Sequence, residues 1–230
     1  MATKQKIGPK TVGNWADALP TMDLDGIKPI FDPFQGVEKD AGRQLIGEQR
    51  HARRTDRKVM LDSRRLANAV EHIGRLPDEG EAFHLVTAKR YSLWNVIEAT
   101  LHLATPATIA YIGIATLGFS RDNLDALLSL IDAGHIGKCD FLFSVYFKSN
   151  EKESCERLAH ELGTRGHRVV AMLTHAKIIL MELTDGRAFV VESSANLRSC
   201  SSIEQIAIFH DRDLFDFHRQ WIDDLMRATA

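Results

Sequence analysis

The sequence predicts an α/β protein with a mixed sheet of about seven strands flanked by helices, preceded by a helical and irregular N-terminal extension. Three observations predict this class. Short apolar, β-rich runs recur from residue 82 onward. Amphipathic segments with helical spacing separate the first four runs. The later runs follow one another closely, which indicates antiparallel strands added to an alternating pattern.

The predicted elements of this sheet can be placed along the chain. The strands are expected at residues 82–88, 106–114, 139–146, 168–173, 176–183, 187–192 and 203–209. The helices are expected at 91–103, 121–133, 152–166 and 211–226. Ser120 is a predicted N-cap for the second helix, and Gly134 a predicted end. The pair Asp185-Gly186 predicts a hairpin between the fifth and sixth strands.

The first 80 residues differ from the rest of the chain in composition and periodicity. Residues 1–40 contain four prolines and no sustained period, which indicates an extended arm. Residues 41–75 have a helical composition. The breaker Leu76-Pro77-Asp78-Glu79-Gly80 follows. We therefore predict two parts, an N-terminal extension over 1–80 and a compact domain over 81–230.

Composition and charge narrow the class of protein. The chain is 44% hydrophobic and 26% charged, which excludes a wholly disordered or collagen-like chain. Its net charge of -2 hides a basic cluster, since residues 41–65 hold eight basic and three acidic residues. Basic side chains near phosphates add affinity through counterion release. From this cluster we single out candidate nucleic-acid contacts: Arg53, Arg54, Arg57 and Lys58. A solvated helix face is the alternative.

Targeting signals and cysteine spacing suggest where the protein works. The N-terminus lacks the apolar core of a secretory signal, and the longest apolar stretch falls short of the roughly 20 residues of a membrane span. The three cysteines are odd in number and lack zinc-site spacing. We therefore expect a cytoplasmic protein with no membrane partner, no metal and no other cofactor.

A basic pair on a predicted strand is the first candidate for chemistry. His175 and Lys177 are two residues apart, so on a strand their side chains share one face, opposite Ala176 and Ile178. A cation on an apolar strand is costly unless it meets an anion. That anion can be a carboxylate of the protein or a phosphate of a ligand.

Polar residues after the hairpin complete the candidate site. Ser194 and Asn196 follow the sixth predicted strand, and their hydroxyl and amide groups can bind an anion. Glu204 lies in the last predicted strand, which can bring it to His175. A carboxylate on one imidazole nitrogen fixes the tautomer and leaves the other nitrogen as nucleophile or base.

This order of His-x-Lys, hairpin, Ser-x-Asn and a following acid resembles the signature of the phospholipase D superfamily. The resemblance spans roughly residues 81–227 in the order of elements. It implies a metal-independent phosphodiesterase in which His175 is the nucleophile and forms a phosphohistidine. It also implies that Glu204 orients this histidine. The family's phosphate-holding residues match Lys177, Ser194 and Asn196 in this sequence.

Two positions depart from the family pattern. In the family, four residues separate the lysine of His-x-Lys from an aspartate. At that position this chain has Glu182, and Asp185 is a second candidate for the same role. The glycine before Ser-x-Asn is Ser193 here, a change expected to tighten or distort the pocket. A catalytically degenerate nucleic-acid-binding or assembly protein therefore stays open as an alternative. A lipid phospholipase is less favoured, because no interfacial anchor is visible.

The number of His-x-Lys motifs indicates how many chains form one active site. The family uses two His-x-Lys motifs in each site, and one histidine attacks while the other protonates the leaving group. This sequence holds one such motif in 230 residues. The resemblance therefore implies a homodimer with His175 of both copies facing each other across a twofold axis. Small single-motif members act on nucleic acid, so we expect a nuclease.

Two expectations concern residues outside the motif. Thr116 follows the second predicted strand and is expected near the site, in contact with substrate. His218, in the last predicted helix, is expected at the surface or as a capping residue.

Overall fold

The computed structural model describes residues 54–198 and 202–229, with side chains from residue 63 onward. The strands are β1 (Ala82–Ala88), β2 (Ile109–Thr116), β3 (Ile136–Ser144), β4 (Arg168–Met172), β5 (Ile178–Leu183), β6 (Ala188–Ser193) and β7 (Ile203–Phe209). The helices are α2 (Arg54–Ile73), α3 (Leu93–Ala104), α4 (Arg121–Asp132), α5 (Val145–Asn150), α6 (Lys152–Thr164) and α7 (Arg212–Ala228).

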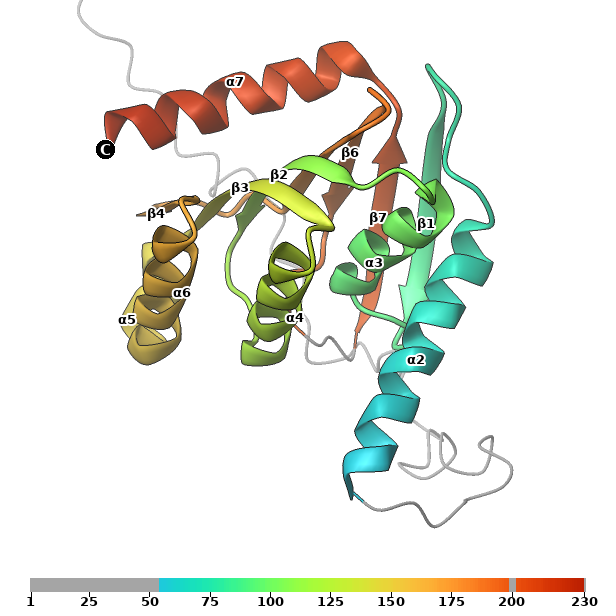
Figure 1. Ribbon diagram of the computed structural model, residues 1–230, viewed down its shortest axis with the longest axis horizontal. Helices are drawn as coiled ribbons and strands as arrows, with labels where there is room; N and C mark the ends of the chain where they lie inside the picture. The colour runs from blue at the N-terminus through green and yellow to red at the C-terminus, as the bar shows by residue number, and fades with distance from the viewer. Residues whose placement is uncertain (1–53, 199–201, 230) are drawn as a thin grey trace, which may run out of the picture. The chain divides into compact units, whose positions relative to one another are not determined.

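The seven strands form one mixed sheet, so the predicted fold class is confirmed (Figure 1). Their order is β1-β7-β6-β5-β2-β3-β4. The pairs β2–β3 and β3–β4 are parallel, and the other neighbours are antiparallel. Strands β1, β2, β3, β4 and β6 therefore end at one edge of the sheet, where β5 and β7 begin. Ligands of open α/β sheets bind at the edge where parallel strands end.

Helices cover the two faces of the sheet unequally. Helix α7 lies on one face, where its Phe215 and Ile222 pack with Leu180 and Val190 of the sheet (Figure 1). Helices α3, α4 and α6 lie on the other face. Their buried side chains form the larger cluster with the opposite face of the same strands. Each central strand is thus apolar on both faces, which explains the nearly continuous apolar runs in the sequence.

Local sequence signals fix the ends of several elements as predicted. Ser120 caps α4 by accepting a hydrogen bond from the backbone N–H of Asn123. Gly134 follows this helix with a φ of 75°, a left-handed conformation that favours glycine. Asp185-Gly186 joins β5 to β6, which pair antiparallel, so the predicted hairpin is confirmed.

Several predicted strand boundaries are wrong, including the end of β2 at Thr116 and the start of β3 at Ile136. Strand β2 begins at Ile109 instead of residue 106. Strand β3 ends at Ser144, because the chain turns there into α5, a helix that the sequence did not predict. Strand β5 begins at Ile178 instead of residue 176. Its partner β6 ends at Ser193, whose N–H donates to the carbonyl of Lys177, so the ladder stops there.

Helix α2 contributes to the same core as the sheet. Ala69 and Ile73 from its last turns are buried within the larger cluster. Part of the predicted 41–75 helical segment, residues 41–53, lies outside the described residues, as does the predicted arm. The division of the chain at residue 80 stays a prediction. Among the described helices, none combines the length and the apolar character needed to cross a bilayer.

The expectation for His218 is wrong. Its side chain is buried between α7 and β6. Its Nε2 lies 3.2 Å from the carboxylate of Glu192, and its Nδ1 accepts a hydrogen bond from the indole N–H of Trp221 at 3.0 Å. The sequence pattern could not reveal this, because Glu192 is 26 residues away and meets His218 only through the packing of α7 on the sheet.

Candidate active site

The five predicted catalytic residues lie at the same edge of the sheet. His175 and Lys177 precede β5, Ser194 and Asn196 follow β6, and Glu204 is the second residue of β7. This is the edge at which the parallel strands end. Strand order and direction bring these residues to one end of three neighbouring strands, although up to 29 positions separate them in the sequence.

His175 and Lys177 contact each other directly. The Lys177 ammonium lies 3.2 Å from Nδ1 of the His175 imidazole and donates to the His175 carbonyl at 3.1 Å. Both residues precede β5 and do not lie in it, so their predicted place on the strand is wrong. Ala176 and Ile178 pack in the cluster beneath α7, as expected for residues on the opposite face. His175 is exposed and Lys177 is half-buried, so both are open to a ligand.

Ser194 is joined to β7 by side-chain and backbone hydrogen bonds. Its hydroxyl donates to the carboxylate of Glu204 and accepts from the backbone N–H of Gln205 at 3.0 Å. Its own N–H donates to the Gln205 carbonyl at 3.0 Å. These bonds tie the predicted phosphate-holding serine to the predicted orienting acid. The pairing of Glu204 with His175 stays a prediction.

Ser193, which replaces the family glycine, takes part in the turn after β6. Its hydroxyl donates to the Gln205 carbonyl at 3.0 Å and accepts from the N–H of Ala195 at 2.9 Å. The side chain thus bonds to the backbone of β7 and to the backbone of the residue that follows Ser194. It helps to fix the position of Ser194 relative to β7.

Asn196 lines a hollow of about 260 Å³ beyond the turn. Its amide oxygen is buried and has no hydrogen-bond partner among the residues that the structure describes. Leu197, the next residue, is held in place because its carbonyl accepts hydrogen bonds from Ser120 and Asn123. The sequence predicted Asn196 as a site residue, but it did not predict the hollow. The hollow is lined by segments that follow three different strands, β2, β3 and β6.

Thr116 lies near the site as expected, but its side chain is buried. Its hydroxyl donates to the Gly118 carbonyl at 3.0 Å and lies 3.4 Å from the N–H of Leu197. The expected contact of Thr116 with substrate is therefore not supported by its position. Thr116 instead supports the backbone beside Asn196.

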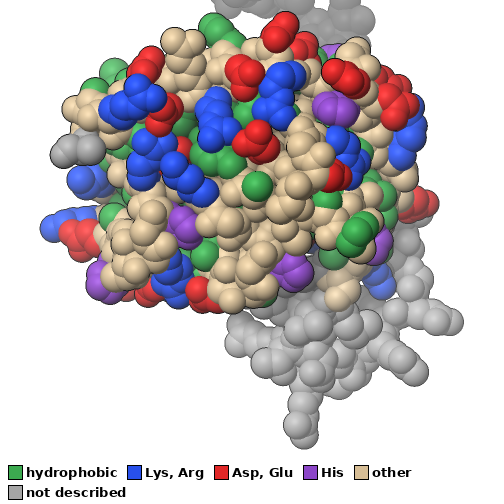
Figure 2. Space-filling view, turned by 45° about the horizontal axis from the view of Figure 1, so that its top comes forward, with side chains coloured by type: hydrophobic (Ala, Val, Ile, Leu, Met, Phe, Trp, Pro, Cys, Tyr) green, Lys and Arg blue, Asp and Glu red, His purple; other side chains and the backbone are tan. Residues whose placement is uncertain are grey.

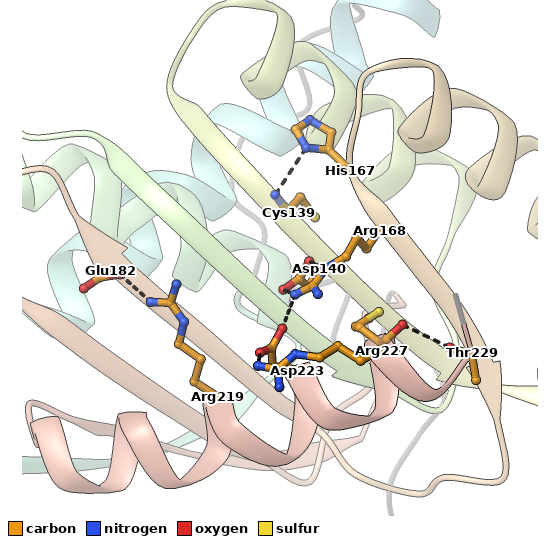
Figure 3. Close-up of polar contacts among 10 residues, drawn as sticks. Cys139, Asp140, His167, Arg168, Glu182, Arg219, Asp223, Arg227 and Thr229 are labelled. Carbon is orange, nitrogen blue, oxygen red and sulfur yellow. Dashed lines mark hydrogen bonds and ion pairs between the residues drawn. The ribbon is translucent and has the colours of Figure 1, made fainter.

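Glu182 and Asp185, the two candidates for the family aspartate, lie away from His175. Glu182 accepts hydrogen bonds from two arginines of α7, from Arg219 at 2.6 Å (Figure 3) and from Arg212 at 3.0 Å. Burial raises the pKa of the Glu182 carboxyl, whereas the two arginines lower it. The effect of the arginines is the larger one, so the pKa lies below the ordinary value. Asp185 pairs with Arg187 within the hairpin. Both acids thus have structural partners.

The predicted nucleic-acid contacts cannot be placed as side chains. Arg53 lies outside the described residues, and Arg54, Arg57 and Lys58 belong to the first turns of α2, whose side chains are not described. Figure 2, in the view that brings α7 forward, shows basic and acidic side chains interspersed. The face in this view thus has mixed charge and is not uniformly basic.

The side chains that the structure describes form no metal-binding cluster, since no group of three or more histidine, cysteine, aspartate or glutamate residues among them is arranged to hold a metal ion. The donor set at the sheet edge consists of an imidazole, an ammonium, a hydroxyl and an amide beside one carboxylate. These groups suit an anionic ligand such as phosphate.

Comparison with known proteins finds similar structures but no matching family model and no matching curated sequence. Polyphosphate kinase from Porphyromonas gingivalis has 14% identity and a TM-score of 0.46, over 66% of this chain and 28% of that one. Phosphatidylserine synthase from Haemophilus influenzae has 14% identity and a TM-score of 0.44, over 64% of this chain and 38% of that one. This chain therefore spans well under two thirds of either protein.

A third similar structure is closer in length. Nuc from Salmonella typhimurium, a phospholipase D family member, has 15% identity and a TM-score of 0.45, over 63% of this chain and 93% of that one. Nuc thus belongs to the family whose motifs the sequence resembles. At such low identity and TM-score the neighbours say nothing about the activity of this chain.

Proposed function

We propose that this chain is a metal-independent phosphodiesterase, a nuclease that uses His175 as its nucleophile. The observation that supports the proposal is the grouping of His175 and Lys177 with the Ser194–Glu204 pair at one sheet edge. The Ser193–Lys177 backbone hydrogen bond, 3.1 Å long, joins the two halves of this group. A nucleophile, a cation and neutral donors together are what attack on a phosphodiester requires.

The first step transfers the phosphoryl group to the enzyme. A nitrogen of the His175 imidazole attacks phosphorus, and the bond from phosphorus to the leaving oxygen breaks. The leaving oxygen takes a proton from His175 of a second copy, which acts as general acid. Lys177 and Asn196 donate hydrogen bonds to the phosphate oxygens as negative charge develops on them, and Ser194 does the same once its hydroxyl turns away from Glu204.

The second step returns the enzyme to its starting state. The His175 of the second copy, now neutral, takes a proton from water as the water oxygen attacks phosphorus. The bond between phosphorus and the imidazole nitrogen then breaks, which releases the phosphate monoester. Both histidines end in their original protonation states, so the cycle needs no metal and no other cofactor.

Exposed apolar side chains beside the site support the involvement of a second copy. Leu173 lies two residues before His175 and is 87% exposed. Ile203 directly precedes Glu204 and is 74% exposed. Large apolar side chains flanking a polar site at one sheet edge are suited to burial in a contact between proteins. An isologous dimer would cover both and bring two copies of His175 together.

The test is cleavage of DNA and RNA in the presence of EDTA. Wild-type protein is expected to cleave at least one of them, and His175→Ala to lose about 1,000-fold or more of this activity, because the nucleophile is missing. His160→Ala is the matched control, since His160 is an exposed histidine on α6. Activity that needs a metal, or that survives in His175→Ala, would contradict the mechanism.

A non-catalytic nucleic-acid-binding protein is the second candidate. Two of the predicted catalytic groups already have partners within the chain, since Lys177 contacts His175 and Glu204 accepts from Ser194. This candidate predicts no cleavage by the wild type, together with nucleic-acid binding that is equal in the wild type and in His175→Ala and weakens as salt rises. The same preparations therefore distinguish the two candidates.

A further inference from the structure

The hollow beside Asn196 has the size of a site for one planar ring. Its volume is about 260 Å³. Pockets for drug-sized ligands measure roughly 300–1,000 Å³, so this hollow suits a smaller group. It is formed where β2, β3 and β6 end, next to the predicted phosphate site. None of the catalytic steps described above uses it, apart from the shared residue Asn196.

The floor of the hollow is aromatic and apolar. Phe147 of α5 lines it and is buried. Gly118 lies against this ring so closely that a Cβ on Gly118 would be 2.6 Å from a ring carbon of Phe147. Glycine is therefore needed for the ring to lie where it does. Gly118 and Phe147 thus form a closely packed apolar part of the lining.

The rim of the hollow carries groups that stack on planar rings. Tyr146 lines the hollow and is 68% exposed, although large aromatic side chains are usually buried. The guanidinium of Arg198 lies 5.4 Å from the centre of the Phe147 ring, and 3.8 Å from the carboxylate of Glu151. Aromatic rings and guanidinium planes are the groups on which unpaired bases stack.

We propose that this hollow binds one base of a nucleic acid, next to the phosphate held at His175. The proposal rests on the proposed function, because it assigns the neighbouring phosphate to the same substrate. Asn196 joins the two sites, because this predicted phosphate-binding residue also lines the hollow. A base within a duplex is stacked and cannot enter such a hollow, so the substrate class is single-stranded or locally unpaired nucleic acid.

Calorimetric titration of the full chain in EDTA tests the base site separately from cleavage. The probes are AMP, ribose 5-phosphate and adenosine. AMP is expected to bind about 10-fold more tightly than ribose 5-phosphate, because only AMP fills the hollow. Tyr146→Ala is expected to remove this difference, whereas Tyr146→Phe keeps it. Phe217→Ala is the control, since Phe217 is 64% exposed on α7 and lies outside the hollow.

The outcomes separate this proposal from the proposed function. Equal affinity for AMP and ribose 5-phosphate overturns the base site, even if the protein cleaves nucleic acid. An equal loss of AMP affinity in Phe217→Ala and Tyr146→Ala also overturns it. Adenosine binding that depends on Tyr146, in a protein with no cleavage activity, overturns the proposed function and leaves the base site standing.

Discussion

Ser193 stands where the phospholipase D motif has glycine, and its hydroxyl makes two hydrogen bonds that glycine cannot make. One goes to the Gln205 carbonyl and the other comes from the Ala195 N–H. Together they fix the turn that presents Ser194. The extra side chain therefore stabilises the backbone of the site.

Removal of the Ser193 hydroxyl is expected to destabilise the protein. Ser193→Ala should lower the free energy of unfolding by about 1–2 kcal/mol, because two backbone groups lose a hydrogen-bond partner. Urea denaturation measures this change. The control is Ser129→Ala, whose hydroxyl bonds only to the carbonyl of Asp125 in its own helix. That change is expected to stay within about 0.5 kcal/mol. Equal stability of Ser193→Ala and the wild type would contradict the assigned role.

Ion pairs between arginines and carboxylates attach helix α7 to the sheet. Arg168 of β4 makes a bidentate pair with Asp140 of β3, at 2.7 and 2.6 Å, and also contacts Asp223 of α7 at 2.7 Å (Figure 3). Asp140 is fully buried. Such a carboxylate is stable only with a partner, so Arg168 links two strands and a helix.

The variant Arg168→Met is expected to lower the free energy of unfolding by about 3 kcal/mol, because it leaves Asp140 buried without its cation. Arg157→Met is the control. Arg157 pairs with Asp125 at 2.6 Å, but both side chains are largely exposed, so its loss should lower the free energy of unfolding by less than about 1 kcal/mol. Thermal or urea unfolding measures both variants. Equal effects would show that Asp140 does not depend on Arg168.

At the scale of the whole molecule, the proposed active site needs a second chain. Each chain supplies one His175, whereas the mechanism uses one histidine as nucleophile and one as general acid. The site lies at an open edge of the sheet beside the exposed Leu173 and Ile203. A twofold dimer at this edge would complete the pair.

Mixed dimers test this requirement directly. Wild-type and His175→Ala chains, mixed in equal parts and allowed to exchange subunits, are expected to retain about one quarter of the wild-type activity, because only dimers with two histidines work. Independent chains would retain about one half. His160→Ala chains, mixed in the same way, should cause no loss. Light scattering should give twice the 25.8 kDa chain mass.

Much of the fold could be predicted from local patterns. The bounds of β1 and β7 and the start of α4 were predicted to the residue, because alternating apolar residues and a capping serine act locally. Helix α5 was missed because it is only six residues long and follows a strand without a breaker. The spacing in the sequence identified the motif residues, but it did not predict which of them contact each other. Glu204 accepts from Ser194, and Lys177 contacts His175.

Periodicity, turn residues and motif spacing are local properties of a chain, so they were enough to predict the fold class and to nominate candidate phosphate-binding residues. Only the tertiary structure decided that Glu182 binds α7, that His218 is buried against Glu192, and that a hollow lies beside Asn196. Each of these depends on segments far apart in the sequence. Sheet order and helix packing bring such segments together, and no local pattern encodes them.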